Sequence, residues 1–320
     1  MNHKLAFIIL TIWLIVLAVP ASAEPVAAPG ATITFAVIGD YGLAGTNELA
    51  VANRVKSWNP DFIITTGDNN YGYGGSGSGS AATIDQNIGQ YYHDYIYPYI
   101  GSYGAGAATN KFFPTLGNHD WYTTDAIPYK NYFVLPNNER YYDFVKGPVH
   151  FFAVSSDRDY EPDGTSSTST QGRWLQGKLA ASTSCWKVVF THHAPYSSGS
   201  SHGSSTWMQW PFQSWGAHVV LAGHEHNYER IIRNGFPYMV NGLGGDSRYP
   251  FGTPITGSVV RYNAKYGAQR VTASDNSITY EFIAADGTVA DTYTQTQTCS
   301  NGGGTPIGGG NASFLPFVKR

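Results

Sequence analysis

Several features that define common protein classes are scarce in this sequence of 320 residues. Cysteine occurs only twice, at Cys185 and Cys299, which excludes a disulfide-dense scaffold and a cysteine-rich zinc site. Charged residues make up 13% of the chain, and 19 basic against 22 acidic residues give a net charge of −3. Because the chain has no basic excess and no basic run, we do not expect it to bind nucleic acid.

Long hydrophobic runs are also scarce, since only residues 5–19 form one. This run follows Lys4 and precedes a proline and the triplet Ala-Ser-Ala, an order that predicts a secretory signal peptide over residues 1–23, cleaved after Ala23. The run is short for a membrane span. We therefore expect an exported protein, secreted or periplasmic, with no stable membrane span after cleavage. An uncleaved N-terminal anchor is the alternative.

Apolar content is ample for a core, because 42% of the residues are hydrophobic and 15% are aromatic. We expect one large domain over residues 24–298 and a flexible, glycine-rich extension over residues 299–320. An even cysteine count in an exported chain permits a disulfide between Cys185 and Cys299, and two buried free thiols are the alternative.

The hydrophobic pattern predicts an α/β fold. Residues 31–40 and 60–68 have the alternation and β-branched content of strands, and residues 46–58 between them have helical spacing. Such a strand–helix–strand unit implies a parallel sheet. Further strands are predicted at residues 111–120, 148–157, 186–193 and 217–226, and further helices at 171–182 and 205–215. From residue 229 to 290 the alternation predicts antiparallel hairpins that form a second sheet packed on the first.

Polar motifs follow five of the predicted strands, at the point where each strand ends. They read GDYG, GDNNY, GNHD, THHAP and GHEH, at residues 39–42, 67–71, 117–120, 191–195 and 223–226. Because ligands of open α/β sheets bind at the carboxyl ends of the strands, we expect these side chains to converge. Each motif alone is typical of a turn or of a structural histidine, whereas the five together indicate a site.

The donor atoms in these motifs are oxygen and nitrogen, with no sulfur. That set suits iron, zinc, manganese, nickel or cobalt, and it contains more donors than one tetrahedral ion requires. Two metal ions are therefore expected. A pair of ions roughly 3.5–4 Å apart can clamp the attacking and leaving oxygens when a phosphate ester is hydrolysed.

In this order, the five motifs resemble those of the calcineurin-like metallophosphoesterase superfamily. The resemblance implies a four-layer α/β/β/α sandwich, in which two mixed β-sheets are flanked by helices. Most members begin with Asp-x-His, whereas here Gly42 stands in place of the histidine after Asp40. The purple acid phosphatase branch also lacks this histidine and uses a tyrosine three residues after the bridging aspartate. Tyr71 has that position relative to Asp68, although a tyrosine without a metal role is the alternative in a chain with 23 tyrosines.

The resemblance also implies the ligands of each ion. The first ion would be held by Asp40, Asp68, Tyr71 and His226. The second would be held by Asp68, Asn118, His193 and His224. The family pattern His-x-Pro selects His193 and leaves His192 as a packing or supporting residue. Alternate residues of a strand end face one side, so His224 and His226 can point to one centre with Glu225 turned away.

The implied cofactor is Fe(III) paired with Fe(II), Zn or Mn, because a tyrosinate stabilises the ferric ion. Such a ligand would absorb visible light and colour the protein. If Tyr71 is not a ligand, a pair of divalent ions such as Zn or Mn becomes the better expectation.

The implied reaction is hydrolysis of small phosphomonoesters by a metal-bound hydroxide. His119 is the first candidate for the acid that protonates the leaving group, with Asp120 expected to orient it. His202, nine residues after His193, is the second candidate. An alternative interpretation is a phosphodiesterase or nucleotide pyrophosphatase with the same metal centre. A second alternative, outside the enzymes, is a surface or metal-binding protein without catalytic activity.

Overall fold

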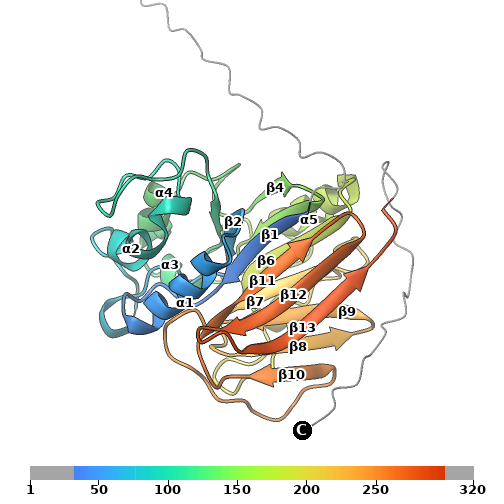
Figure 1. Ribbon diagram of the computed structural model, residues 1–320. Coiled ribbons are helices and arrows are strands. Elements are labelled where there is room, and N and C mark those ends of the chain that lie inside the picture. The colour runs from blue at the N-terminus through green and yellow to red at the C-terminus, as the bar shows by residue number, and fades with distance from the viewer. Residues whose placement is uncertain (1–31, 76, 300–320) are drawn as a thin grey trace, which may run out of the picture.

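A computed structural model describes residues 32–75 and 77–299, and the predicted signal peptide and residues 300–320 lie outside this range (Figure 1). The described chain forms two β-sheets flanked by helices, as predicted. The six-stranded sheet has the order β13 (Val289–Thr296), β12 (Ser277–Ala284), β11 (Gly267–Ala273), β1 (Ile33–Ile38), β2 (Phe62–Thr65), β3 (Phe112–Pro114). The seven-stranded sheet has the order β10 (Ser258–Tyr262), β8 (Tyr228–Arg233), β9 (Phe236–Asn241), β7 (Val219–Gly223), β6 (Trp186–His193), β5 (Val149–Val154), β4 (Tyr142–Lys146).

Helices connect and cover these sheets. The α-helices are α1 (Thr46–Ser57), α2 (Gln90–Tyr92), α3 (Asn118–Trp121), α4 (Ile127–Tyr132) and α5 (Thr170–Ala181). Shorter 3-10 or π turns are η1 (Tyr73–Gly75), η2 (Asp85–Gly89), η3 (His93–Tyr95), η4 (Thr124–Ala126) and η5 (Thr206–Met208). The helix predicted at 205–215 is wrong, since only η5 forms there. Pro211 interrupts the segment because it has no backbone N–H to donate.

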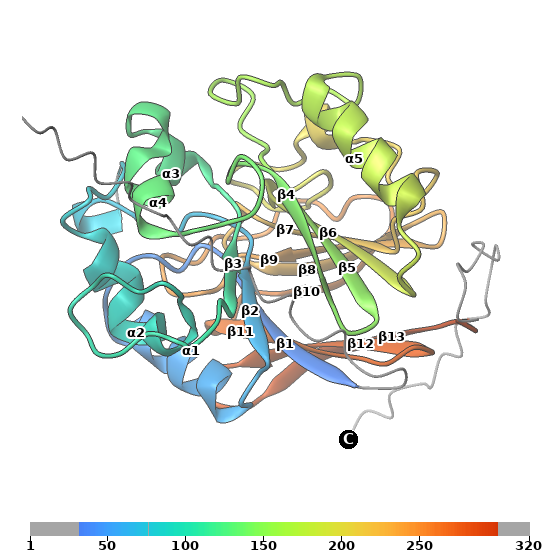
Figure 2. The ribbon, with the colours of Figure 1, turned by 90° about the horizontal axis from the view of Figure 1, so that it is seen from above.

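The period of two in the central strands sorts their side chains between two apolar layers. In β6, Val188 and Phe190 join the layer shared with the six-stranded sheet, whereas Val189 joins the layer that contains Leu175 and Leu179 of α5. Figure 2 shows α5 on the opposite side of the seven-stranded sheet from β1 and β11–β13. This alternation holds as far as Phe190, after which the pairing of β6 with β7 shifts register before His193.

The C-terminal strands are divided between the two sheets, which corrects the prediction that they form the second sheet by themselves. β8, β9 and β10 extend the seven-stranded sheet, whereas β11, β12 and β13 extend the six-stranded one (Figure 1). The first described strand, β1, pairs in parallel with β2 and antiparallel with β11, so that Ile33 lies opposite Ala273. Both sheets are therefore mixed.

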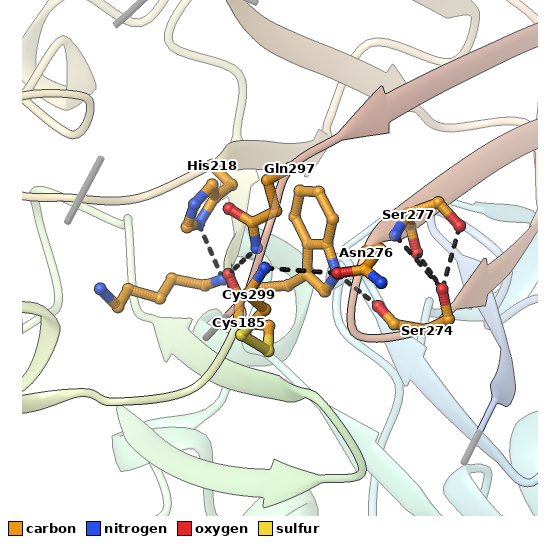
Figure 3. The surroundings of a disulfide bond; sticks show 9 residues. Cys185, His218, Ser274, Asn276, Ser277, Gln297 and Cys299 are labelled. Carbon is orange, nitrogen blue, oxygen red and sulfur yellow. Dashed lines mark hydrogen bonds between the residues drawn. A yellow bond between two sulfur atoms is a disulfide. The ribbon is translucent and has the colours of Figure 1, made fainter. Parts of the chain in front are cut away.

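A disulfide joins Cys185, at the start of β6, to Cys299, with the two Cα atoms 5.6 Å apart (Figure 3). Of the two alternatives that the sequence left open, the structure has the bridge, and it ties the first residue of the predicted extension to the body. The Gln297 side chain donates to the carbonyl of Cys185, and the Cys299 N–H donates to Asn276 Oδ1 at 3.3 Å. Within the described ranges, no helix has both the length and the apolar character that crossing a membrane requires.

Candidate metal centre

Strand ends from both sheets deliver the predicted donors. Asp40 and Asp68 lie two and three residues after the ends of β1 and β2, and Asn118 begins α3 shortly after β3. From the other sheet, β6 ends at His193 and His224 directly follows β7. Because β1–β3 are parallel to one another and β6 is parallel to β7, each group of carboxyl ends meets at one edge of its sheet.

Three of these residues have left-handed backbone conformations. The φ angles are 54° at Asp40, 54° at Asp68 and 70° at His224. A residue other than glycine in this region costs on the order of 1–3 kcal/mol and persists only where its surroundings determine it. Such residues concentrate at ligand-binding sites. The backbone therefore fixes the direction of these side chains at an energetic cost.

The four donors expected around the first ion lie together. Ligand atoms of Asp40, Asp68 and His226 are all within 4.8 Å of one another. The Tyr71 hydroxyl donates to Asp68 Oδ2 at 2.9 Å, and it lies 3.4 Å from Asp40 Oδ1 and 3.3 Å from His226 Nε2. Tyr71 is only 1% exposed. Its phenol oxygen is therefore at the centre of the donor group rather than at its edge.

A second donor group also contains Asp68. The group is Asp68, His192 and His224, again with ligand atoms within 4.8 Å. His192 Nε2 lies 3.0 Å from Asn118 Oδ1, 3.1 Å from His224 Nδ1 and 3.4 Å from Asp68 Oδ2. His192 thus lies among three of the expected ligands of the second ion.

His193 lies at the edge of the same group, with its ring 4.3 Å from that of His224 and 5.1 Å from that of His192. Its Nδ1 is hydrogen-bonded to Ser156 Oγ at 2.9 Å, and its ring lies 5.5 Å from that of Trp207. The alternation that turns Val188 and Phe190 toward the six-stranded sheet does not extend to these histidines, because the pairing of β6 with β7 shifts register between Phe190 and His193. Both imidazoles can therefore lie beside His224.

The tautomers of two histidines suit metal binding. His192 Nδ1 lies 2.8 Å from the carbonyl of Thr66, and His226 Nδ1 lies 3.1 Å from that of Ser247. A carbonyl oxygen can only accept, so each Nδ1 carries a proton and donates it. This leaves Nε2 of both rings directed at the carboxylates, the arrangement typical of histidines that bind a metal through Nε2.

The buried donors include carboxylates whose negative charge a nearby positive charge would stabilise. Burial raises the pKa of Asp68, but His192 beside it more than offsets this effect and holds the pKa well below its usual value. Burial lowers the pKa of His192, but the negative charge of Asp68 raises it by more, so that the pKa is about 9. Burial and then Asp68 raise the pKa of Tyr71 well above its usual value. A proton on His192 can thus balance the carboxylates where a cation would otherwise do so.

His119 lies at the edge of this centre. Its Nδ1 donates to the carbonyl of Gly77 at 2.6 Å, so Nε2 is the atom that faces the donors, 4.0 Å from Asp68 Oδ2. Asp120 does not have the predicted role of orienting His119. Its carboxylate accepts instead from the backbone N–H groups of Asn69 and Gly117, and burial followed by repulsion from Asp68 raises its pKa to about 7.

His202 lies on the other side, with its ring 4.0 Å from that of His224. The loop that carries it is held by Glu225, a fully buried residue between the two histidines of GHEH. Glu225 Oε1 accepts from the backbone N–H groups of His202 and Gly203, the latter at 2.6 Å. Glu225 is turned away from the donors, as predicted, but its hold on the His202 loop was not predicted.

The described chain is similar to known phosphoesterases in sequence. A family model described as "Calcineurin-like phosphoesterase" matches residues 33–228. Purple acid phosphatase 23 of Arabidopsis thaliana is 28% identical over 228 residues, which are 62% of this chain and 47% of that protein. Purple acid phosphatase 17 of the same plant is 24% identical over 270 residues, 73% of this chain and 74% of that protein. The chain thus spans less than half the length of the first relative.

Two solved structures show the same fold. Purple acid phosphatase PPD1 from yellow lupin (Lupinus luteus) has a TM-score of 0.67 at 18% identity, covering 84% of this chain and 55% of that one. GAP50, described as the anchor in the inner membrane complex of Plasmodium, has a TM-score of 0.63 at 20% identity, covering 84% and 90%. With five motifs in family order, converging donors and a model match over most of the chain, the protein belongs to the calcineurin-like phosphoesterase family.

Proposed function

We propose that this protein is an exported phosphatase with two metal ions that hydrolyses phosphomonoesters. The observation that carries the proposal is the sharing of Asp68 between two donor groups, each with its ligand atoms within 4.8 Å. A shared carboxylate is what a pair of ions a few ångströms apart requires. The similarity to purple acid phosphatases supports the reaction class.

The donors fit two cations. We assign the first ion to Asp40, Asp68, Tyr71 and His226, and the second to Asp68, Asn118, His192 and His224. Both carboxylates are at most 1% exposed, and the ion-pair partners found for them in the described chain are histidines. Buried carboxylates without lysine or arginine partners are costly unless a cation or proton neutralises them. Tyr71 would bind as the phenolate, because a metal ion reverses the effect of burial on its pKa.

When bound, the two ions would supply the Lewis acidity that makes a water molecule nucleophilic and balances charge on the phosphoryl oxygens. With a proton on each ring nitrogen, His119 would give its Nε2 proton to the leaving oxygen as the P–O bond breaks. Nδ1 of His119 cannot do so while it donates to Gly77. His202, on the opposite side, is placed to donate to a phosphoryl oxygen.

The tyrosine favours Fe(III) in the first position, with Fe(II), Zn or Mn in the second. Export rests on the predicted signal peptide, residues 1–23, and we propose that residues 24–298 form the catalytic domain. GAP50 shows that this fold also occurs in a protein described as an anchor. The complete donor set of the present chain favours the hydrolase over a role without catalysis.

The test is to purify the protein, measure its metal content and visible spectrum, and assay p-nitrophenyl phosphate against its bis ester. We expect two metal ions per chain, a visible band from the tyrosinate, and faster hydrolysis of the monoester. Asp68→Ala should lose both ions and the activity, whereas Asp94→Ala, which removes a surface ion pair with Lys56, should keep both. Metal-loaded wild type that hydrolyses neither ester would refute the proposal, and a faster diester reaction would assign it to the diesterase class.

A further inference from the structure

A line of aromatic rings runs from the buried donors to the surface. Tyr71 is 1% exposed, and its ring centroid lies 4.4 Å from that of His119. The His119 ring lies 5.2 Å from Tyr122, and Tyr122 lies 6.3 Å from Tyr160. Tyr122 and Tyr160 are 51% and 50% exposed, whereas the His119 side chain is 19% exposed. We call His119, Tyr122 and Tyr160 the aromatic wall.

Both tyrosines of the aromatic wall are held in place. The Tyr122 hydroxyl accepts from Asn118 Nδ2 at 2.8 Å, which leaves Asn118 Oδ1 directed at His192. The Tyr160 ring stacks on Trp121 at 6.4 Å and 10°, and Trp121 is buried with its Nε1 donating to Ser155 Oγ. Exposed rings that are already ordered lose little side-chain entropy when a ligand packs against them.

The position of the wall identifies the part of the substrate that meets it. If His119 Nε2 protonates the leaving oxygen, the atoms attached to that oxygen must lie beside the His119 ring. The next group outward is Tyr122, followed by Tyr160. Flat rings pack favourably on such surfaces, in offset-stacked or edge-to-face geometry, beyond the gain from burying apolar area.

We propose that the aromatic wall binds the leaving group and that the substrates are phosphomonoesters whose leaving group carries an aromatic ring. This inference rests on the proposed function and adds the substrate class. It assigns Tyr122 and Tyr160 to specificity, since both rings follow His119 in the line that leads from the buried donors to the surface.

The test compares benzyl phosphate with cyclohexylmethyl phosphate, two esters of primary alcohols that differ in having a flat or a puckered ring. We expect kcat/KM to be higher for benzyl phosphate by about threefold to tenfold, the range that one or two aromatic contacts supply. In Tyr160→Ala this ratio should fall toward one. Tyr103→Ala, which removes a 40% exposed tyrosine between η3 and β3, should leave the ratio unchanged.

Binding gives a second measurement that does not depend on turnover. Calorimetric titration of the metal-loaded protein with benzylphosphonate and cyclohexylmethylphosphonate should show the same preference in Kd, and the same loss in Tyr160→Ala. Equal values for the two esters and the two phosphonates would overturn the inference while the proposed function stands. A preference that survives in Tyr160→Ala would also overturn the assignment to the wall. Hydrolysis of neither ester would overturn the proposed function, and the inference with it.

Discussion

The two ends of strand β6 differ in how their polar groups are satisfied. At its start, Cys185 is bonded to Cys299, and the Trp186 Nε1 and Lys187 N–H groups donate to Ser274 and His218 (Figure 3). At its end, His192 lies among carboxylate, amide and imidazole acceptors that crowd within a few ångströms. The polar groups at the first end are hydrogen-bonded within the protein. The crowded groups at the second end would be stabilised by a positive charge. The same strand therefore combines a stable end with an end that can form a reactive site.

Opening the disulfide should affect stability far more than the metal centre. Cys185 and Cys299 are 114 residues apart, and closing a loop of that length stabilises the fold by roughly 4 to 5 kcal/mol in the chain-entropy model. We expect Cys185→Ser with Cys299→Ser to lower the free energy of unfolding in urea by about that amount. Metal content and kcat at 25 °C should remain those of the wild type. A loss of metal without a loss of stability would show that the two ends of β6 are not independent.

Acid should destabilise the same end through His218. Its Nδ1 accepts from the Lys187 N–H, and burial followed by the charge of Lys187 lowers its pKa from 6.5 to about 4. Between these pH values the unfolded chain takes up a proton that the folded chain does not. The contribution is therefore complete above about pH 6.5 and decreases as the pH falls toward 4, by about 3 kcal/mol in total.

The measurement for His218 is the free energy of unfolding at pH 7.5 and pH 4.5. His218→Asn keeps an acceptor for the Lys187 N–H but does not titrate, so we expect its stability to decrease less between the two pH values than that of the wild type. Equal decreases would show that His218 does not contribute to acid sensitivity.

At the other end of β6, His192 and His193 form a matched pair. Partners that only support a metal ligand are worth about 10- to 100-fold in affinity or activity, so removing the ligand itself in His192→Ala should cost at least about a hundredfold. The variant should also bind one ion instead of two. His193→Ala loses the bond to Ser156 and should cost less than about tenfold, the worth of one hydrogen bond. The reverse order of effects would restore the original prediction for His193.

Glu225 gives the smallest expected effect. Glu225→Ala frees the His202 loop and should lower kcat by about tenfold, as for other supporting residues. Both N–H groups bond to Oε1 alone, so the amide oxygen of Glu225→Gln should restore most of the rate. In a His202→Ala background, Glu225→Ala should have little further effect. Additive losses would mean that Glu225 acts by another route.

The features that can be predicted from the sequence are those that depend on residues close to one another in the chain. The strand–helix–strand unit at β1–α1–β2 and the five motifs at strand ends depend on neighbouring residues, and the structure brings the motifs together. The choice between His192 and His193 depends on the backbone at the end of β6, where the pairing with β7 shifts register, and family spacing does not encode it. The hold of Glu225 on the His202 loop depends on a contact between residues 23 positions apart. The division of β8–β13 between two sheets depends on long-range pairing, which alternation cannot reveal.

The pairing of β1 with β11 has a consequence for how the chain acquires its structure. Ile33 lies opposite Ala273, so β1 can pair on this side only after a segment 240 positions later has been synthesised. Pairing over such separations is slow and leaves strand edges open in the meantime. We expect nascent chains that stop short of β11 to remain open to proteases and chaperones, and the native state to form only after β11 has been synthesised.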